Sequence, residues 1–181
     1  MLDTSTMALS TGNAVLERWN ALDAAQAARE VLPCCGSCAW AEGLATRRPF
    51  ASAADLLAAS DEVWWALAER DWQEAFDSHP RIGQQHAKTA TAESLQWSAQ
   101  EQGAAMSHDE ALKAALADGN RRYEDQFGRI FIVCASGRSA AEILNILERR
   151  MENTPDVELR EAAEQQRQIT NLRLRRWLGV E

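Results

Sequence analysis

Residues 156–178 read DVELREAAEQQRQITNLRLRRWL, and their spacing predicts a long amphipathic helix. Residues at intervals of three or four share one face of a helix. Six apolar or uncharged residues fall on such a face, namely Leu159, Ala162, Ala163, Gln166, Ile169 and Trp177. This pattern predicts a helix whose stripe faces a protein core.

Arg173 falls inside this stripe, whereas the other arginines of the stretch fall off it. A buried charge without a partner is costly, so an arginine on a core-facing stripe needs an anion. The anion could be a carboxylate side chain such as Glu101, or a carboxylate substrate held by the planar guanidinium fork. Alternatively, the stem of Arg173 packs and its charged head reaches solvent.

The rest of the chain also favours helices, and we expect an all-α, single-domain compact bundle of about eight or nine helices. Helical spacing predicts further helices at residues 13–31, 37–47, 53–59, 61–76, 99–105, 108–127 and 139–152. Pro33 is expected to follow the end of the first helix, and Ser52 and Ser60 are expected as N-caps. Ser98 and Ser107 each precede a glutamate by three residues, a capping-box pattern that predicts a helix start.

Two stretches do not fit a helix. Residues 84–97 are polar and weakly patterned, which predicts a connection. Residues 130–134, IFIVC, are apolar and β-branched between two glycines, but the chain offers no partner strand. We therefore expect a short buried extended segment near 130–135, whose backbone groups must find partners outside a helix.

Length, net charge and composition exclude several classes of protein. The 181 residues suit one domain, expected at 11–181 after a loose N-terminal tail at 1–10. The net charge of −8 disfavours nucleic-acid binding, and no apolar run is long enough to predict a membrane span. No secretory signal or peroxisomal tripeptide is evident, so we expect a cytoplasmic protein.

Four cysteines, Cys34, Cys35, Cys38 and Cys134, raise the question of a metal. The cluster at 34–38 lacks a second ligand pair at zinc spacing and has no nearby histidine. We expect buried or half-buried free thiols and no metal site.

His79 and Glu101 are candidate catalytic residues, each with a structural alternative. The residue before a proline is restricted to extended geometry, so Pro80 holds His79 on a stiff corner. Imidazole can give or take a proton near neutral pH, although a lone histidine is more often a capping or core residue. Glu101 could likewise serve only as the capping-box glutamate. His86 and His108 lie in polar surroundings and are expected at the surface.

Several short motifs, in this order along the chain, resemble the OHCU decarboxylase family, where OHCU is 2-oxo-4-hydroxy-4-carboxy-5-ureidoimidazoline. They are Arg48-Pro-Phe50, His79-Pro-Arg-Ile-Gly83, Ser98-x-x-Glu101-Gln102, Tyr123-Glu-Asp-Gln-Phe127-Gly128, Phe131-Ile-Val-Cys-Ala135 and Ile169-Thr-Asn-Leu-Arg173-Leu174. Arg81 and Ile82 differ from the animal members, which makes the chain similar to a bacterial-type member.

The resemblance implies an all-α carboxy-lyase, usually a homodimer, that needs no cofactor and converts OHCU to (S)-allantoin in urate degradation. It implies His79, Glu101 and Arg173 as catalytic residues, with His79 transferring the proton and Glu101 favouring its charged form. It implies a substrate pocket lined by Pro80, Ser98, Ala99, Gln100, Glu101, Gln102, Phe131, Ile132, Val133, Cys134 and Ala135. The alternatives are a helical module that binds a purine-derived ligand without turnover, and a lyase or hydrolase acting on a related ureido acid.

Overall fold

The computed structural model describes residues 13–84, 87, 89–103 and 109–180. Within these residues the chain forms nine α-helices and no strand, which confirms the predicted all-α class. The helices are α1 (Ala14–Asn20), α2 (Ala24–Cys35), α3 (Cys38–Thr46), α4 (Ala53–Ala66), α5 (Glu69–Asp77), α6 (Ala92–Glu101), α7 (Glu110–Phe127), α8 (Ala140–Arg150) and α9 (Pro155–Leu178). In the described part of the chain, no helix combines the length and apolar character that crossing a membrane requires.

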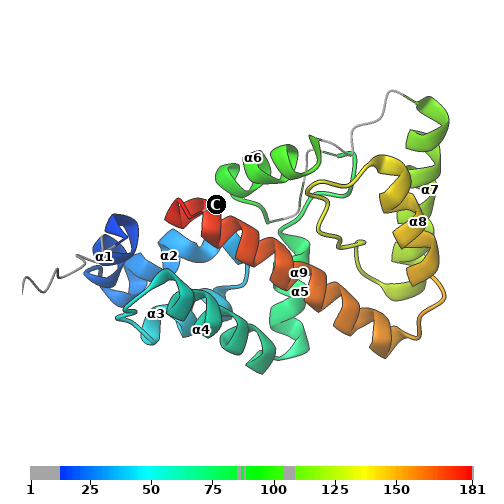
Figure 1. Ribbon diagram of the computed structural model, residues 1–181. Coiled ribbons are helices and arrows are strands. Elements are labelled where there is room, and N and C mark those ends of the chain that lie inside the picture. The colour runs from blue at the N-terminus through cyan, green and yellow to red at the C-terminus, as the bar shows by residue number, and fades with distance from the viewer. Residues whose placement is uncertain (1–12, 85–86, 88, 104–108, 181) are drawn as a thin grey trace, which may run out of the picture.

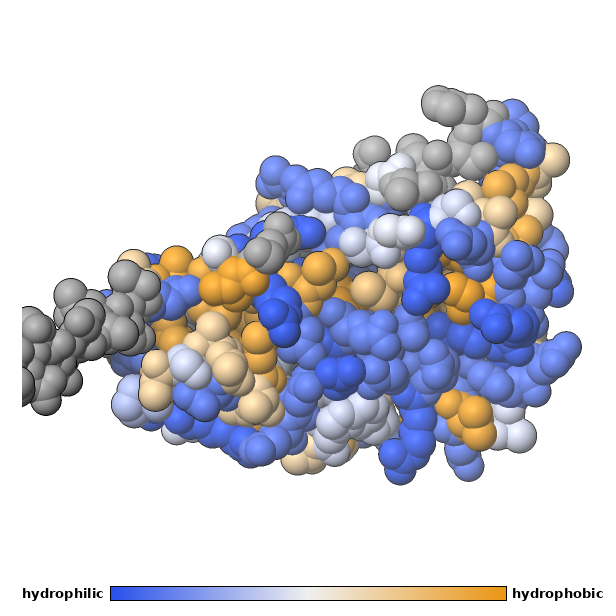
Figure 2. Space-filling view, viewed as in Figure 1, coloured by the Kyte–Doolittle hydropathy of each residue, from blue (hydrophilic) through white to orange (hydrophobic). Residues whose placement is uncertain are grey.

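The long helix α9 organises the molecule. It runs diagonally across Figure 1 and packs against α1, α2, α4 and α5 on one side, while α7 and α8 form a pair at its other end. The larger hydrophobic cluster lies around α9 and the first five helices, and the smaller one lies between α7 and α8. The face in Figure 2 is mainly hydrophilic, and many of its hydrophobic residues gather near α1 and the C-terminal end of α9.

The segment after α7 separates the two clusters. Ile130 and Ile132 belong to the larger cluster, whereas Phe131, Val133 and Ala135 belong to the smaller one. Side chains that alternate between opposite sides are the mark of extended backbone. The predicted buried extended segment is therefore confirmed, and it forms a wall between the two cores.

The predicted first helix is in fact two helices. The chain breaks between Asn20 and Ala24, where the Asp23 side chain accepts a hydrogen bond from the Gln26 N–H and caps α2. The expectation that the helix ends before Pro33 was also wrong, because Pro33 lies inside α2. The helix instead ends at Gly36, which adopts a left-handed conformation that glycine accepts readily.

Two other helix starts were misplaced. Ser52 does cap α4, but Ser60 lies within that helix and its hydroxyl accepts a hydrogen bond from the Trp40 indole N–H. The break falls later, at residues 67–68. Thr91 caps α6, so Ser98 and part of the expected connection at 84–97 are helical.

The remaining predicted elements are found close to their expected bounds. Ser37 caps α3. Helices α7 and α8 fall within the ranges expected for helices, and α9 begins one residue before its expected range. The predictions for the tail at 1–10, His86, Ser107 and His108 concern residues outside the described part.

Gly36 packs closely against the end of α5, and we expect Gly36→Ala to be unusually destabilising. An added Cβ would lie 2.2 Å from the Ser78 hydroxyl oxygen, and φ is +88°. Gly137 supplies the control, because its φ is +75° and no atom lies within 4 Å of the added Cβ. Gly137→Ala should cost about 1 kcal/mol for the backbone alone, and Gly36→Ala roughly 2 kcal/mol more for the overlap. Urea unfolding measures both; equal losses would contradict the close contact.

Candidate active site

His79 lies at the corner that follows α5. The helix ends at Asp77, the His79 N–H still donates to the Phe76 carbonyl at 3.0 Å, and Pro80 then turns the chain away. The side chain is 8% exposed, and its Nε2 atom is buried without a hydrogen-bond partner in the described part of the chain. An unpaired buried polar atom is costly and is often explained by a ligand that supplies the partner.

The surroundings keep His79 neutral. Burial and, to a lesser extent, the positive charge of Arg173 lower the pKa of His79 to about 3, although the nearby Gln166 side chain opposes the shift. This lowered pKa runs against the expectation that Glu101 favours the charged imidazolium, and that role of Glu101 stays a prediction. The positive charge of Arg173 disfavours protonation of the ring, so the imidazole is neutral at neutral pH.

Arg173 is paired with Glu101 in the protein interior. Its Nε and Nη2 atoms each donate to one oxygen of the Glu101 carboxylate at 2.8 Å, and Nη2 also donates to the Ser98 hydroxyl at 3.0 Å. Arg173 is 1% exposed, so the alternative in which its head reaches solvent does not hold. Glu101 sits at the last position of α6, where it cannot act as the capping glutamate of a helix start.

A small pocket lies between His79 and this ion pair. It is lined by His79, Pro80, Ile82, Ser98, Glu101, Gln102, Phe131, Ile132, Val133, Ala135 and Ile169. The centre of a water molecule has only about 20 Å³ in which to move, so a ring-sized ligand requires neighbouring groups to shift. The pocket thus brings together four chain segments that lie far apart in sequence, namely 79–82, 98–102, 131–135 and the part of α9 at Ile169.

Three of the residues expected to line this pocket do not line it. Ser98, Glu101 and Gln102 are spaced three and four apart, so they share the buried face of α6. Ala99 and Gln100 fall on the opposite face and are exposed. Cys134 points into the other cluster as its neighbours alternate, and it lines a different surface hollow.

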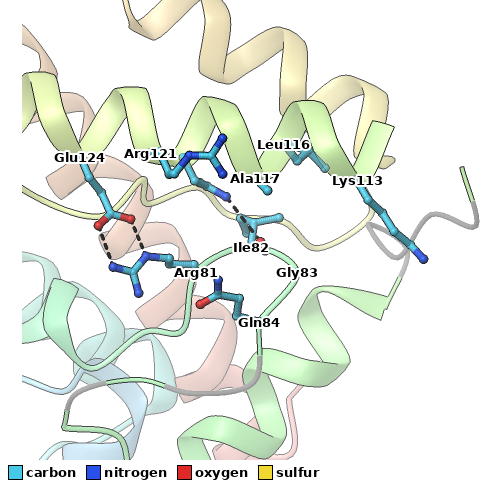
Figure 3. A pocket seen from close by; sticks show the side chains of 10 residues that line it. Arg81, Ile82, Gly83, Gln84, Lys113, Leu116, Ala117, Arg121 and Glu124 are labelled. Atoms are coloured by element: carbon cyan, nitrogen blue, oxygen red, sulfur yellow. Dashed lines mark hydrogen bonds and ion pairs between the residues drawn. The ribbon is translucent and has the colours of Figure 1, made fainter. Parts of the chain in front are cut away.

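The loop that carries the histidine corner is fastened on both sides. Figure 3 shows Arg81 reaching Glu124 on α7, with Nε to Oε1 at 2.5 Å and Nη2 to Oε2 at 2.7 Å. On the other side, the Gly83 N–H donates to the Gln102 side-chain oxygen at 2.9 Å. Helices α6 and α7 thus hold the loop in place, a function that the sequence analysis did not assign to these residues.

The groove drawn in Figure 3 is wider than the pocket beside His79, but its charged residues are already occupied. Arg81 pairs with Glu124, Lys113 with Glu110 and Arg121 with Asp118. Among the residues that the structure describes, no histidine lines this groove. The chemistry therefore points to the smaller pocket.

The cysteines give no metal site in the described residues, where no group of three or more potential ligands converges. Cys34 and Cys35 are buried free thiols, and burial raises the pKa of Cys35 to about 12. Cys38 is exposed, contrary to the expectation that the cluster is buried or half-buried.

Comparison with known proteins gives consistent matches. A model of the OHCU decarboxylase family matches residues 20–175. The chain is 40% identical over 143 residues to the "Uric acid degradation bifunctional protein TTL" of Arabidopsis thaliana, covering 78% of this chain but 44% of that protein. It is 29% identical over 127 residues to the 2-oxo-4-hydroxy-4-carboxy-5-ureidoimidazoline decarboxylase of Amia calva, covering 70% of this chain and 73% of the relative.

Two solved structures share the fold. One is an OHCU decarboxylase crystallised in the presence of (S)-allantoin, with a TM-score of 0.72, 35% identity, and coverage of 83% of this chain and 97% of that chain. The other is an (S)-allantoin synthase, with a TM-score of 0.67, 19% identity, and coverage of 90% and 53%. The second match supports the fold alone.

Proposed function

The chain belongs to the OHCU decarboxylase family, and we propose that it decarboxylates OHCU to (S)-allantoin in urate degradation. It spans less than half the length of the bifunctional Arabidopsis relative, so the proposal concerns this one reaction. The observation that carries it is the convergence of a buried neutral histidine, a buried carboxylate and an extended backbone segment on one pocket.

The name of the substrate fixes what the site must do. OHCU carries a hydroxyl and a carboxyl group on one ring carbon and a ureido group on the next. Breaking the bond to the carboxyl carbon releases CO₂ and leaves its electron pair in the ring, giving an enol and a negatively charged ring nitrogen. The enol hydroxyl then loses a proton, the carbon bearing the ureido group gains one, and solvent protonates the nitrogen.

His79 suits the two proton transfers at oxygen and carbon. A neutral imidazole accepts the hydroxyl proton and can return it to the adjacent carbon without leaving its position. Because Pro80 and the end of α5 fix the ring, delivery comes from one face, and one enantiomer of allantoin results. The lowered pKa of His79 also makes its protonated form a strong acid toward the carbon.

Glu101 and Arg173 shape the pocket around that ring. Glu101 lines the pocket, whereas both forked donors of Arg173 are used by Glu101 and Ser98. We therefore assign Arg173 to holding Glu101 and disfavouring imidazolium, instead of gripping the departing carboxylate. A tight ion pair with that carboxylate would stabilise the ground state as well as the transition state.

The extended segment provides backbone N–H groups for the charge that develops on the ring. Preorganised N–H donors in a site with little water are among the strongest means of stabilising such charge. Pro80, Ser98, Gln102 and the pocket-lining residues of 131–135 form the remaining substrate surface of the proposal. We further propose a cytoplasmic homodimer that needs no cofactor, the state implied by the resemblance.

A coupled assay tests this function. OHCU is generated freshly from urate, the protein is added, and optical rotation is followed against the spontaneous reaction. We expect faster loss of OHCU and an excess of (S)-allantoin. Ligand binding without acceleration would favour the binding module, and turnover only of another ureido acid would favour the related lyase or hydrolase.

A further inference from the structure

The extended segment at residues 130–135, which lines the pocket, is held by hydrogen bonds from side chains outside the pocket. These bonds are made to Ile132 and Cys134. Arg150 Nη1 donates to the Ile132 carbonyl at 2.6 Å. The Cys134 N–H donates to the side-chain oxygen of Gln165 at 3.0 Å, and the Cys134 carbonyl accepts from Arg138 Nε at 3.0 Å. Three anchors therefore act on two residues of a segment that has no helix or strand of its own.

These anchors decide which backbone groups are left for the pocket. In an extended chain, the N–H and C=O groups of successive residues point to opposite edges. The Ile132 carbonyl and both backbone groups of Cys134 bond the anchoring side chains. Extended geometry then directs the backbone groups of Val133, and the Ala135 N–H, to the other edge. Both residues line the pocket beside His79. Loss of an anchor would let these donors rotate away.

Gln165 is itself held in one orientation. Its Nε2 atom donates to the Glu161 carboxylate, one turn earlier on α9, at 3.0 Å. That bond leaves the amide oxygen to accept from Cys134, and the side chain is 9% exposed. The acceptor is thus both buried and fixed.

Arg150 is held more firmly still. Its Nε and Nη2 atoms donate to Glu158 at 2.8 and 2.5 Å, and its guanidinium lies 4.7 Å from the centre of the Phe131 ring. Glu158 is fully buried and also accepts from Asn153 and Tyr123. A buried ion pair is seldom a net source of stability, but it fixes a donor at one point in space.

We infer that Gln165, together with the buried Arg150–Glu158 pair, positions the backbone of residues 132–134 for the decarboxylation. These are positioning residues, since they touch the segment and not the pocket. The inference rests on the proposed function. It explains why a carboxylate, a guanidinium and an amide are buried behind a wall of apolar side chains.

Gln165→Met is the sharpest test, because it removes the acceptor while keeping the length of the side chain. We expect kcat/KM to fall about 10- to 100-fold, mainly through kcat, and the excess of (S)-allantoin to decrease. Hydrogen exchange at the Cys134 amide should accelerate. Gln168→Met on the same helix is the matched control, since among the described residues the Gln168 side chain hydrogen-bonds Glu164 and not the 130–135 segment; its kinetics should match the wild type.

A swapped pair tests rescue. In Glu161→Gln/Gln165→Glu, the new amide can donate to the new carboxylate, whose second oxygen accepts from Cys134, so most activity should return. Arg150→Met/Glu158→Gln removes the other anchor without leaving a buried charge, and it should reduce kcat and optical purity in the same way. Wild-type kinetics and optical purity in Gln165→Met would overturn the inference alone. Absence of turnover by the wild type would overturn the proposed function, and the inference with it.

Discussion

Replacing His79 by alanine should lower kcat/KM for OHCU by about 100- to 10,000-fold, the range for removal of a general acid–base group. The imidazole lies at the end of α5, and its Nε2 atom is buried and unpaired among the described residues. Without the imidazole, water must carry out both proton transfers, at the enol hydroxyl and at the carbon that bears the ureido group. The allantoin that still forms should therefore approach a racemic mixture. Polarimetry of the coupled reaction measures both effects, and near wild-type turnover would remove His79 from the mechanism.

The matched variant His79→Gln separates a chemical loss from a folding loss, and its stability should respond differently to pH. The pKa of His79 is lowered to about 3 in the folded protein, so the unfolded chain binds the proton more readily. Wild-type stability should therefore be complete above the unfolded pKa and fall as pH decreases from about 6.5 toward 3, by roughly 1.4 kcal/mol per pH unit. His79→Gln lacks this contribution.

Urea unfolding at pH 7 and pH 5 provides the measurement. Wild type should lose about 2 kcal/mol more than His79→Gln between the two values. A variant that is folded at pH 7 but inactive assigns the loss of rate to chemistry. Equal pH dependence in the two proteins would show that His79 titrates normally, which would contradict its buried, neutral state.

The helical class could be predicted from spacing alone, but the breaks between helices could not all be. Residues 13–31 have continuous apolar spacing, yet Asp23 caps a new helix by bonding the Gln26 N–H. Serine is a preferred N-cap residue, but the hydroxyl of Ser60 instead accepts a hydrogen bond from the buried indole N–H of Trp40. The Asp23 cap is a local bond that competes with a continuous helix, whereas the partner of Ser60 is chosen by tertiary packing.

The candidate active site could likewise be predicted only in part. The stripe on α9 was enough to predict that Arg173 needs an anion, and Glu101 was one of the partners considered. The state of His79 could not be derived this way, because it depends on burial and on Arg173, which is distant in sequence. Gln165 lies off the predicted stripe, and only the fold brings it to Cys134. The spacing of residues along the sequence can identify a buried charge such as Arg173. It cannot identify which backbone group the Gln165 amide will hydrogen-bond.

Arg173→Met should have the largest effect on stability, because it removes both 2.8 Å hydrogen bonds to the buried Glu101 carboxylate and leaves it the longer, 3.8 Å contact with Arg176 Nη1. Breaking a buried pair in this way typically costs about 3–5 kcal/mol. The double variant Arg173→Met/Glu101→Gln replaces the charge by an amide and should recover most of that loss. Urea unfolding at neutral pH measures both, and a small loss in the single variant would show that the carboxylate gains water or a proton at little cost.

Activity should not recover with stability. In the double variant, the pocket has lost the carboxylate at Glu101 and the charge that disfavours imidazolium, so kcat/KM should stay at least 10-fold below wild type. Arg173→Lys refines the test, since it keeps the charge but cannot make two parallel bonds to Glu101 while also reaching Ser98. We expect a folded enzyme with reduced kcat/KM. Unchanged kinetics in Arg173→Lys would show that the fork geometry is irrelevant, and a fully active double variant would make the pair purely structural.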